Sequence, residues 1–239
     1  MEETYNLTAI ILNRRNFLED DGRVVVYSRE RGKLELVVRG MKKIKSKLAG
    51  HLEPMTLSNI MAVRGRQYDY VGSAMSQNCY FNIKNDLDKL IAAGQAIKIF
   101  NKIIKTDQVD KKIFGLIKNF LDILEDSVKG AYDLLLWLFI FELLIELGHK
   151  PELFNCVSCE KKIMPGNIKF DLARGGLICE KCFTNIDRIN QLTISENSVK
   201  LLRLTEKNDL EKLVKIKIDK KTGGEIKNIV SSFLNHQLF

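Results

Sequence analysis

The sequence lacks the motifs that mark common catalytic sites. It has no Gly-rich phosphate-binding loop of the Walker type, no His-Glu-x-x-His and no Gly-x-Ser-x-Gly. Only 3 histidines are present, and acidic pairs such as Asp20-Asp21 and Glu125-Asp126 are typical of turns and helix ends. The sequence therefore predicts a protein that is not an enzyme and that takes no small-molecule substrate.

Long hydrophobic runs are also missing. The most apolar segment, LLLWLFIFELLIEL (134–147), is too short to span a bilayer, which takes about 20 residues. The N-terminus, MEETYNLTAI, has no basic segment followed by an apolar one, as a signal peptide would. We expect no membrane association and a cytoplasmic location, and we interpret residues 134–147 as a buried core helix.

The sequence has few prolines, and it has fewer acidic than basic residues. Only 3 prolines accompany 45% apolar residues, which predicts a folded core rather than disorder. The 38 Lys and Arg residues outnumber the 30 Asp and Glu residues, so the net charge is +8. A basic balance suits a polyanionic partner. The densest basic stretch, residues 29–47, carries eight basic and two acidic side chains.

The N-terminal part of the chain has the pattern of β-strands. The segment 23–40, RVVVYSRERGKLELVVRG, contains two β-branched runs joined by a polar turn, which indicates a hairpin. Further strands are expected at 4–15, 53–65 and 68–81. Five short strands predict an OB-type β-barrel over residues 1–81.

From residue 82 onward apolar residues recur every three or four positions, as in helices. The expected helices span 86–105, 110–126, 134–147, 195–205, 209–218 and 222–239. We therefore predict an α+β, multidomain chain, in which the barrel is followed by a helical domain, 82–239. A zinc-binding insertion is expected within it at about 154–184.

Four of the 5 cysteines form two pairs, Cys156 with Cys159 and Cys179 with Cys182. The spacing C-x2-C-x19-C-x2-C is that of a four-cysteine zinc site, and a reducing cytosol favours metal ligands over disulfides. Four thiolates leave no position for water, so one Zn²⁺ ion would be structural. A redox pair needs one exposed thiolate of low pKa and fits less well; a rubredoxin-like iron is a further alternative.

Basic and aromatic residues of the barrel form the candidate DNA-binding set. Cations that neutralise phosphates, with rings that stack on bases, suit single-stranded nucleic acid. The alternatives are a merely solvated basic surface and, for Tyr27, a place in the core. Tyr68 and Tyr70 adjoin the set as possible stacking rings. Its members are Arg23, Tyr27, Arg29, Arg31, Lys33, Arg39, Lys42, Lys43, Lys45, Lys47, Arg64 and Arg66.

Three segments resemble the RecO family of bacterial recombination mediators. These are YSRERGKLELVVRGMKKIKSKLAGHLEPMTL, with its Arg-Gly turn and basic loop, FELLIELGHKPELFNCVSC, and GGLICEKC. They lie between about residues 20 and 185. Family members often have glycine after the second cysteine of the first pair, where this chain has Glu160.

The resemblance implies an OB domain, a helical domain with a zinc knuckle, and no catalytic residues. It also implies binding of single- and double-stranded DNA, annealing of complementary strands and a nucleoid-associated location. The expected partners are RecR and the C-terminal tail of the single-stranded-DNA-binding protein SSB, and the expected role is loading RecA onto SSB-coated DNA in the RecF pathway. Two alternatives stay open on the residues alone: an RNA-binding factor with OB and zinc-ribbon parts, and a zinc-dependent enzyme.

Overall fold

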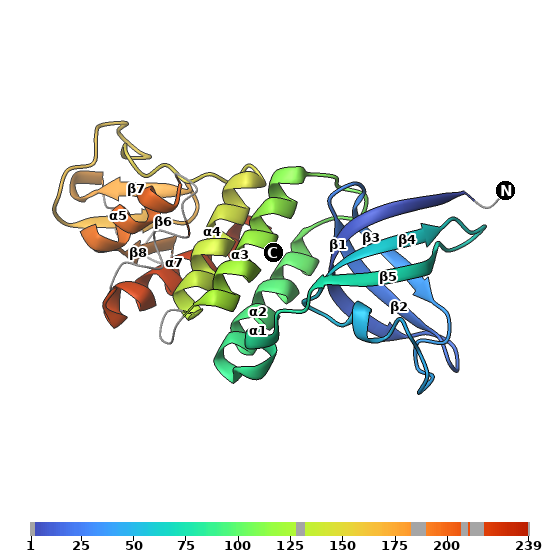
Figure 1. Ribbon diagram of the computed structural model, residues 1–239. Helices are drawn as coiled ribbons and strands as arrows, with labels where there is room; N and C mark the ends of the chain where they lie inside the picture. The colour runs from blue at the N-terminus through green and yellow to red at the C-terminus, as the bar shows by residue number, and fades with distance from the viewer. Residues whose placement is uncertain (1–2, 128–131, 183–189, 207–209, 211–217, 239) are drawn as a thin grey trace. The chain divides into compact units, whose positions relative to one another are not determined.

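The computed structural model describes residues 3–127, 132–182, 190–206, 210 and 218–238. The chain forms two compact units, Met1–Asp126 and Ser127–Phe239 (Figure 1). None of the helices in these described ranges is both long and apolar enough to cross a membrane.

The first unit begins with five strands that close into a barrel (Figure 1). The strands are β1 (Thr4–Asn16), β2 (Gly22–Ser28), β3 (Gly32–Val38), β4 (Leu57–Val63) and β5 (Tyr70–Asn78). They pair in the order β1-β2-β3-β5-β4, and β4 returns to β1. A five-stranded barrel of this kind is typical of the OB-fold, so the predicted fold class is confirmed.

The barrel core follows from the alternation of side chains along each strand. Even-numbered residues of the predicted hairpin point inward, where Val24 and Val26 of β2 meet Leu36 and Val38 of β3, all four with no exposed surface. Branched apolar side chains of the other strands complete this interior. Register is therefore fixed by burial, because a slip of one residue would turn the apolar set outward.

Three helices pack in the same compact unit as the barrel: α1 (Phe81–Asn85), α2 (Leu87–Ile103) and α3 (Lys111–Asp126). The side chain of Asp86 caps the start of α2 by accepting hydrogen bonds from the amides of Asp88 and Lys89. The domain boundary at residue 81 was predicted from the change in sequence pattern and stays a prediction. By packing, α1, α2 and α3 belong to the same compact unit as the barrel.

The second unit contains the helices α4 (Tyr132–Glu146), α5 (Glu196–Thr205) and α7 (Lys220–Leu238). They confirm the helices expected at 134–147, 195–205 and 222–239, whereas the one expected at 209–218 lies, apart from residues 210 and 218, outside the described residues. The helix α4 is buried on nearly all sides, as its apolar sequence predicts.

The second unit also holds a small antiparallel sheet that the sequence did not predict. Its strands are β6 (Ile168–Asp171), β7 (Gly176–Cys179) and β8 (Gln191–Thr193), in the order β7-β6-β8. Phe170 of β6 is fully buried and meets the ring of Phe233 on α7 edge-on, with 5.4 Å between ring centroids. The segment between the cysteine pairs therefore has apolar packing of its own.

Candidate nucleic-acid interface and metal centre

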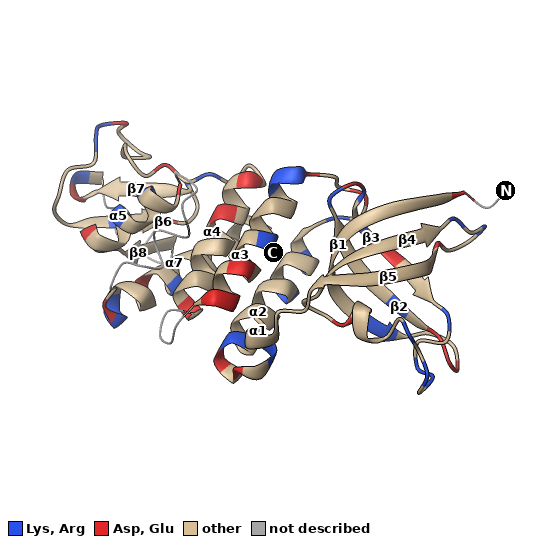
Figure 2. Ribbon diagram, viewed as in Figure 1, with Lys and Arg blue, Asp and Glu red and all other residues tan. Residues whose placement is uncertain are grey.

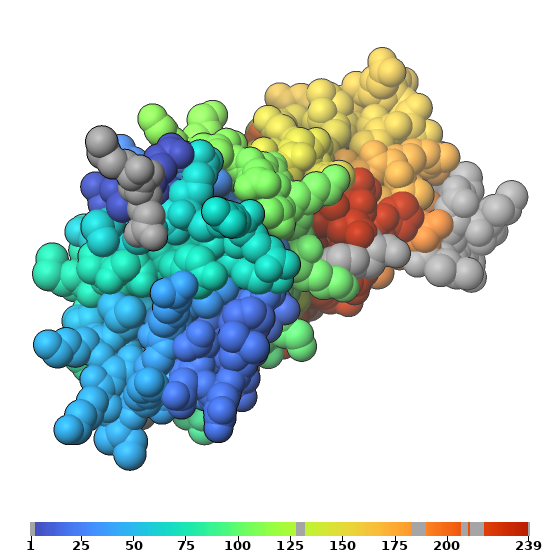
Figure 3. Space-filling view, turned by 90° about the vertical axis from the view of Figure 1, so that its right-hand side faces the viewer, coloured from blue at the N-terminus to red at the C-terminus, as the bar shows by residue number. Residues whose placement is uncertain are grey.

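A lysine-rich segment, residues 39–47, projects from the barrel after β3; we call it the lysine segment. Its Lys42, Lys43, Lys45 and Lys47 are all exposed. Figures 2 and 3 show it beside the acidic turn 17–21 that joins β1 to β2. Met41 anchors the segment by burying its side chain in the barrel core.

Hydrogen bonds hold the lysine segment to the 17–21 turn. The backbone amide of Lys42 donates to the carbonyl of Asp20 (3.0 Å), and the amide of Gly40 donates to the carboxylate of Asp21 (2.8 Å). The ammonium of Lys43 lies 3.5 Å from the Asp20 carboxylate, and that of Lys42 donates to the carbonyl of Leu18. The segment is thus a fixed projection that presents positive charge.

Next to it, Arg23 of β2 lies against two aromatic rings. Its guanidinium carbon is 3.9 Å from the ring centroid of Phe17 and 4.4 Å from that of Tyr68. The guanidinium also forms an ion pair with Glu35 of β3 at 3.6 Å. Arg39 lies in the same way over Tyr70, at 4.4 Å. Cation–π contacts of this kind hold the rings and cations together.

The sequence did not single out Phe17, and nothing local would have identified it. Phe17, Arg23 and Tyr68 come from the β1–β2 loop, β2 and the β4–β5 loop, and only barrel closure brings them together. The position of these residues could have indicated their role, because OB-folds bind nucleic acid on the β2–β3 face and with the β1–β2 and β4–β5 loops. An aromatic residue in either loop is therefore a candidate for stacking on bases.

Two members of the predicted DNA-binding set have internal roles instead. Tyr27 has no exposed surface; its ring packs on Phe100 of α2 and Phe114 of α3, and its hydroxyl donates to the carbonyl of Asp110. A fully buried ring cannot stack on a base, so the prediction for Tyr27 is corrected. The alternation of residues predicted which face of the hairpin carries Tyr27, but it did not predict that α2 and α3 cover this face.

Lys33 has a structural role too. Its ammonium donates to the backbone carbonyls of Asn101 and Ile104, which are at the C-terminal end of α2. Positive charge at this helix end is favourable. Burial, and next the charge of Arg15, lower the pKa of Lys33. We therefore remove Lys33 from the candidate contacts.

The remaining cations of the set differ in how they are paired. Arg29, Lys45, Lys47 and Arg66 are exposed and have no ion pair or ring contact within the part of the chain that the structure describes. Arg31 lies over the ring of Tyr5 at 4.0 Å, and Arg64 is paired with Glu3 at 2.7 Å. Surface ion pairs are weak, so the pair with Glu3 leaves Arg64 able to contact a phosphate. These residues stay candidates.

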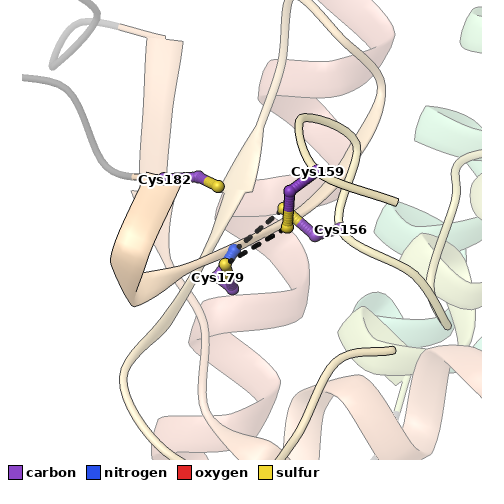
Figure 4. Close-up of side chains that lie close together, drawn as sticks. All are labelled: Cys156, Cys159, Cys179 and Cys182. Atoms are coloured by element: carbon purple, nitrogen blue, oxygen red, sulfur yellow. Dashed lines mark hydrogen bonds between the residues drawn. The ribbon is translucent and has the colours of Figure 1, made fainter. Parts of the chain in front are cut away.

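The four predicted metal ligands converge at one point of the second unit. Cys156 and Cys159 lie in the loop after α4, Cys179 ends β7, and Cys182 ends the short helical turn Glu180–Cys182 (Figure 4). All four sulfur atoms lie within 4.8 Å of one another, and those of Cys159 and Cys179 are 3.9 Å apart. Four thiolates around one tetrahedral zinc ion would be about 3.8 Å apart. The cluster therefore fits a four-coordinate metal ion.

Hydrogen bonds from backbone amides favour the thiolate form of Cys156. Burial raises the pKa of the Cys156 thiol, but hydrogen bonds from the amides of Cys179, Cys159 and Ser158 outweigh burial and lower this pKa to about 6. The neighbouring sulfurs of Cys179 and Cys159 raise the pKa of Cys182 to about 12. Metal ligation requires the deprotonated form of each thiol. A bound cation would therefore offset the repulsion among the four thiolates.

Local backbone geometry brings the two cysteine pairs together. Gly176 lies so close to the first pair that a Cβ atom there would be 2.5 Å from the carbonyl oxygen of Glu152. Gly175 has φ +65°, a left-handed conformation that favours glycine. Glu160, after the first pair, has φ +60° and donates its amide to the carbonyl of Cys156. A glycine would adopt this left-handed conformation with less strain than Glu160 does.

The chain is similar to proteins of known family over nearly its full length. The model described as "Recombination protein O N terminal" matches residues 1–79, and "Recombination protein O C terminal" matches residues 84–239. Similar proteins include those named DNA repair protein RecO from Desulforamulus reducens (29% identity, covering 98% of this chain and 90% of the relative) and from Roseiflexus sp. (28%, covering 99% and 82%). Another, from Syntrophus aciditrophicus, is 27% identical and covers 98% of this chain and 91% of its own.

The two matches meet where the barrel ends and the helices begin, and they leave only residues 80–83 between them. Together with the OB-type barrel and the cysteine cluster, they show that the chain belongs to the RecO family of DNA repair proteins.

Proposed function

We propose that this protein is a non-enzymatic mediator of homologous recombination in the RecF pathway. It binds single- and double-stranded DNA, anneals complementary strands, and helps load RecA onto DNA coated with SSB. Its partners are RecR and the SSB tail, and it acts in the cytoplasm, at the nucleoid. Membership of the RecO family supports this proposal.

The observation that carries the DNA-binding part is the composition of one end of the barrel. The lysine segment supplies phosphate contacts, and the half-exposed rings of Phe17 and Tyr68 beside Arg23 supply stacking surfaces. The two rings lie in the β1–β2 and β4–β5 loops, where OB-folds bind oligonucleotides, and the lysine segment is hydrogen-bonded to the first of these loops. Phosphate contacts give affinity for any DNA, while rings act only on bases that are free to stack.

We propose that the metal of the cysteine cluster is zinc and that its role is structural. Zinc takes four thiolates in a tetrahedral site and has no redox chemistry of its own. The four cysteines connect the loop after α4 to β7, so a bound ion would fix that loop on the small sheet. A site filled by four protein ligands has no position for a substrate or a water molecule.

For the SSB tail, which is acidic and ends in Phe, we propose a binding place beside α5. Two surface hollows flank this helix, and Lys200 lines both. The larger, about 280 Å³, is also lined by Leu201 and Leu204. Lys200→Glu should weaken binding of a tail peptide in calorimetry, and salt should weaken binding to the unchanged protein; no detectable heat would contradict the pocket.

Annealing of complementary oligonucleotides, with and without SSB, tests the function. We expect the protein to accelerate annealing of both naked and SSB-coated strands. Competition of labelled single-stranded DNA by RNA of the same sequence tests the alternative of an RNA-binding factor, because tighter binding of RNA would favour it. Failure to anneal in either condition would contradict the proposal.

A further inference from the structure

Two apolar side chains stand in solvent among the cations of the barrel. Ile44, in the middle of the lysine segment, is fully exposed, and Leu18, in the adjoining 17–21 turn, is 71% exposed. Neither is in the barrel core, which Met41 of the lysine segment and Leu48 just after it contact instead. Single exposed apolar residues are common on proteins.

Ile44 and Leu18 both lie in turns whose backbone is held by hydrogen bonds. Ile44 lies within a turn that the bond from the amide of Ser46 to the carbonyl of Lys43 closes (2.9 Å), three residues after the anchored Met41. Leu18 has φ +49°, a conformation that side chains larger than glycine rarely adopt. Its turn is closed by the bond from the amide of Phe17 to the carbonyl of Asp21 (3.1 Å).

The two projections are also connected to each other. The ammonium of Lys42 donates to the carbonyl of Leu18 (2.9 Å), and the amide of Lys42 donates to the carbonyl of Asp20 (3.0 Å). Isoleucine is stiff at χ1 because it is β-branched. Both apolar side chains therefore project from backbone that hydrogen bonds hold in place, and Ile44 has lysines on both sides.

We propose that Ile44 and Leu18 form a wedge that contacts unstacked bases at a junction between duplex and single-stranded DNA. This inference rests on the proposed function and specifies the DNA structure that the barrel recognises. The lysines around Ile44 neutralise phosphates, so DNA bound to them has its bases near the apolar tips. Proteins that kink DNA insert Leu, Ile or Met between bases in this way.

A junction suits these tips better than an intact duplex. Entering an internal base step requires unstacking it, which costs free energy. At a junction the last base pair already has one free face, and an aliphatic side chain can cover it without that cost. The aromatic pair Phe17 and Tyr68 can then stack on bases of the emerging single strand.

The test compares three DNAs: a single strand, a blunt duplex, and a duplex with a single-stranded tail. The tailed duplex carries 2-aminopurine, which fluoresces more when unstacked, at its first unpaired position, because the tips would displace this base from the free face of the last base pair. We expect the unchanged protein to raise this fluorescence. Ile44→Ser with Leu18→Ser should abolish the rise and weaken binding to the junction about tenfold, as expected for losing two partly buried aliphatic contacts. Single-strand affinity and its salt dependence should stay unchanged.

Two control variants separate the wedge from general effects. Leu87→Ser removes an equally exposed leucine (70%) from α2 and should change nothing. Lys45→Ala should weaken binding to all three DNAs alike. If the unchanged protein binds no DNA, the proposed function fails; if it binds DNA but Ile44→Ser with Leu18→Ser behaves like Leu87→Ser, only the wedge is overturned. Loss of binding to anionic lipid vesicles, with junction binding retained, would instead assign the tips to a membrane surface.

Discussion

The ring of Tyr27 on β2 meets the ring of Phe100 on α2 edge-on, with 5.0 Å between the centroids. This contact joins the outer face of the barrel to the helices that follow it. The hydroxyl of Tyr27 reaches the carbonyl of Asp110, just before α3, at 3.2 Å. One end of the β2–β3 face is therefore closed by protein, while the end with Arg23 stays half-exposed.

Tyr27→Phe should lower the free energy of unfolding by about 1 kcal/mol, because the hydroxyl loses its bond to Asp110. The affinity for single-stranded DNA should not change. Chemical denaturation and fluorescence anisotropy on one preparation measure the two quantities. A variant of unchanged stability that binds DNA more weakly would return Tyr27 to the interface.

The same residue predicts a dependence of stability on pH. Burial and the nearby Asp110 carboxylate raise the pKa of Tyr27 to about 12, against about 10 in an unfolded chain. The neutral phenol therefore contributes stability that is fully present below about pH 10 and is lost as pH rises from there toward 12. Tyr27→Phe should lose less stability than the unchanged protein over this range in denaturation at stepped pH values; equal losses would contradict the assignment.

Tyr68→Ala should weaken binding of single-stranded DNA about tenfold, because stacking is worth about 1–3 kcal/mol per base. Tyr68→Phe keeps the ring and is the matched control. Affinity for a blunt duplex should hardly change, since its bases are already stacked on each other. Equal loss for single strand and duplex would mean that Tyr68 acts through Arg23 and the fold rather than through stacking.

Cys156→Ser should remove the metal and destabilise the second unit by about 3 kcal/mol or more, because metal binding in such sites contributes folding free energy. Metal content by mass spectrometry and thermal unfolding give the readouts. The barrel belongs to the other compact unit, so its affinity for single-stranded DNA should persist. A metal-free protein with unchanged unfolding would contradict the structural role.

Glu160→Gly should raise the free energy of unfolding by about 0.5–1 kcal/mol. A left-handed conformation costs a non-glycine residue about 1–2 kcal/mol, and the greater freedom of glycine in the unfolded chain offsets part of the gain. Thermal unfolding of the metal-loaded protein measures the effect. Destabilisation would show that the glutamate side chain has a stabilising contact that exceeds the strain.

The barrel and the metal cluster could both be predicted from local patterns. Val24, Val25 and Val26 form a short β-branched run next to a polar turn, as expected of a strand. The two Cys-x-x-Cys pairs have the spacing of a tetrahedral site, and the structure brings their sulfurs within 4.8 Å. In both cases the information lies within a short segment or in a fixed spacing.

Features that depend on distant segments could not be predicted in this way. Alternation places Tyr27 on the outer face of β2, away from the core valines. It does not show that Phe100 and Phe114 cover this outer face. The contact between Arg23 and Tyr68 exists only because the barrel closes. The strands β6 to β8 have three or four residues each, too few for a period of two to be recognised.

The central claim is that the lysine segment neutralises DNA phosphates, and the salt dependence of binding tests it most directly. Affinity for a single-stranded oligonucleotide is measured from low to moderate salt for the unchanged protein and for the variant with Lys42, Lys43, Lys45 and Lys47 all replaced by Ala. If all four contact phosphates, the slope of log affinity against log salt should flatten by roughly 3 units in the variant. An unchanged slope in a folded variant would contradict the account and would make the segment a solvated surface.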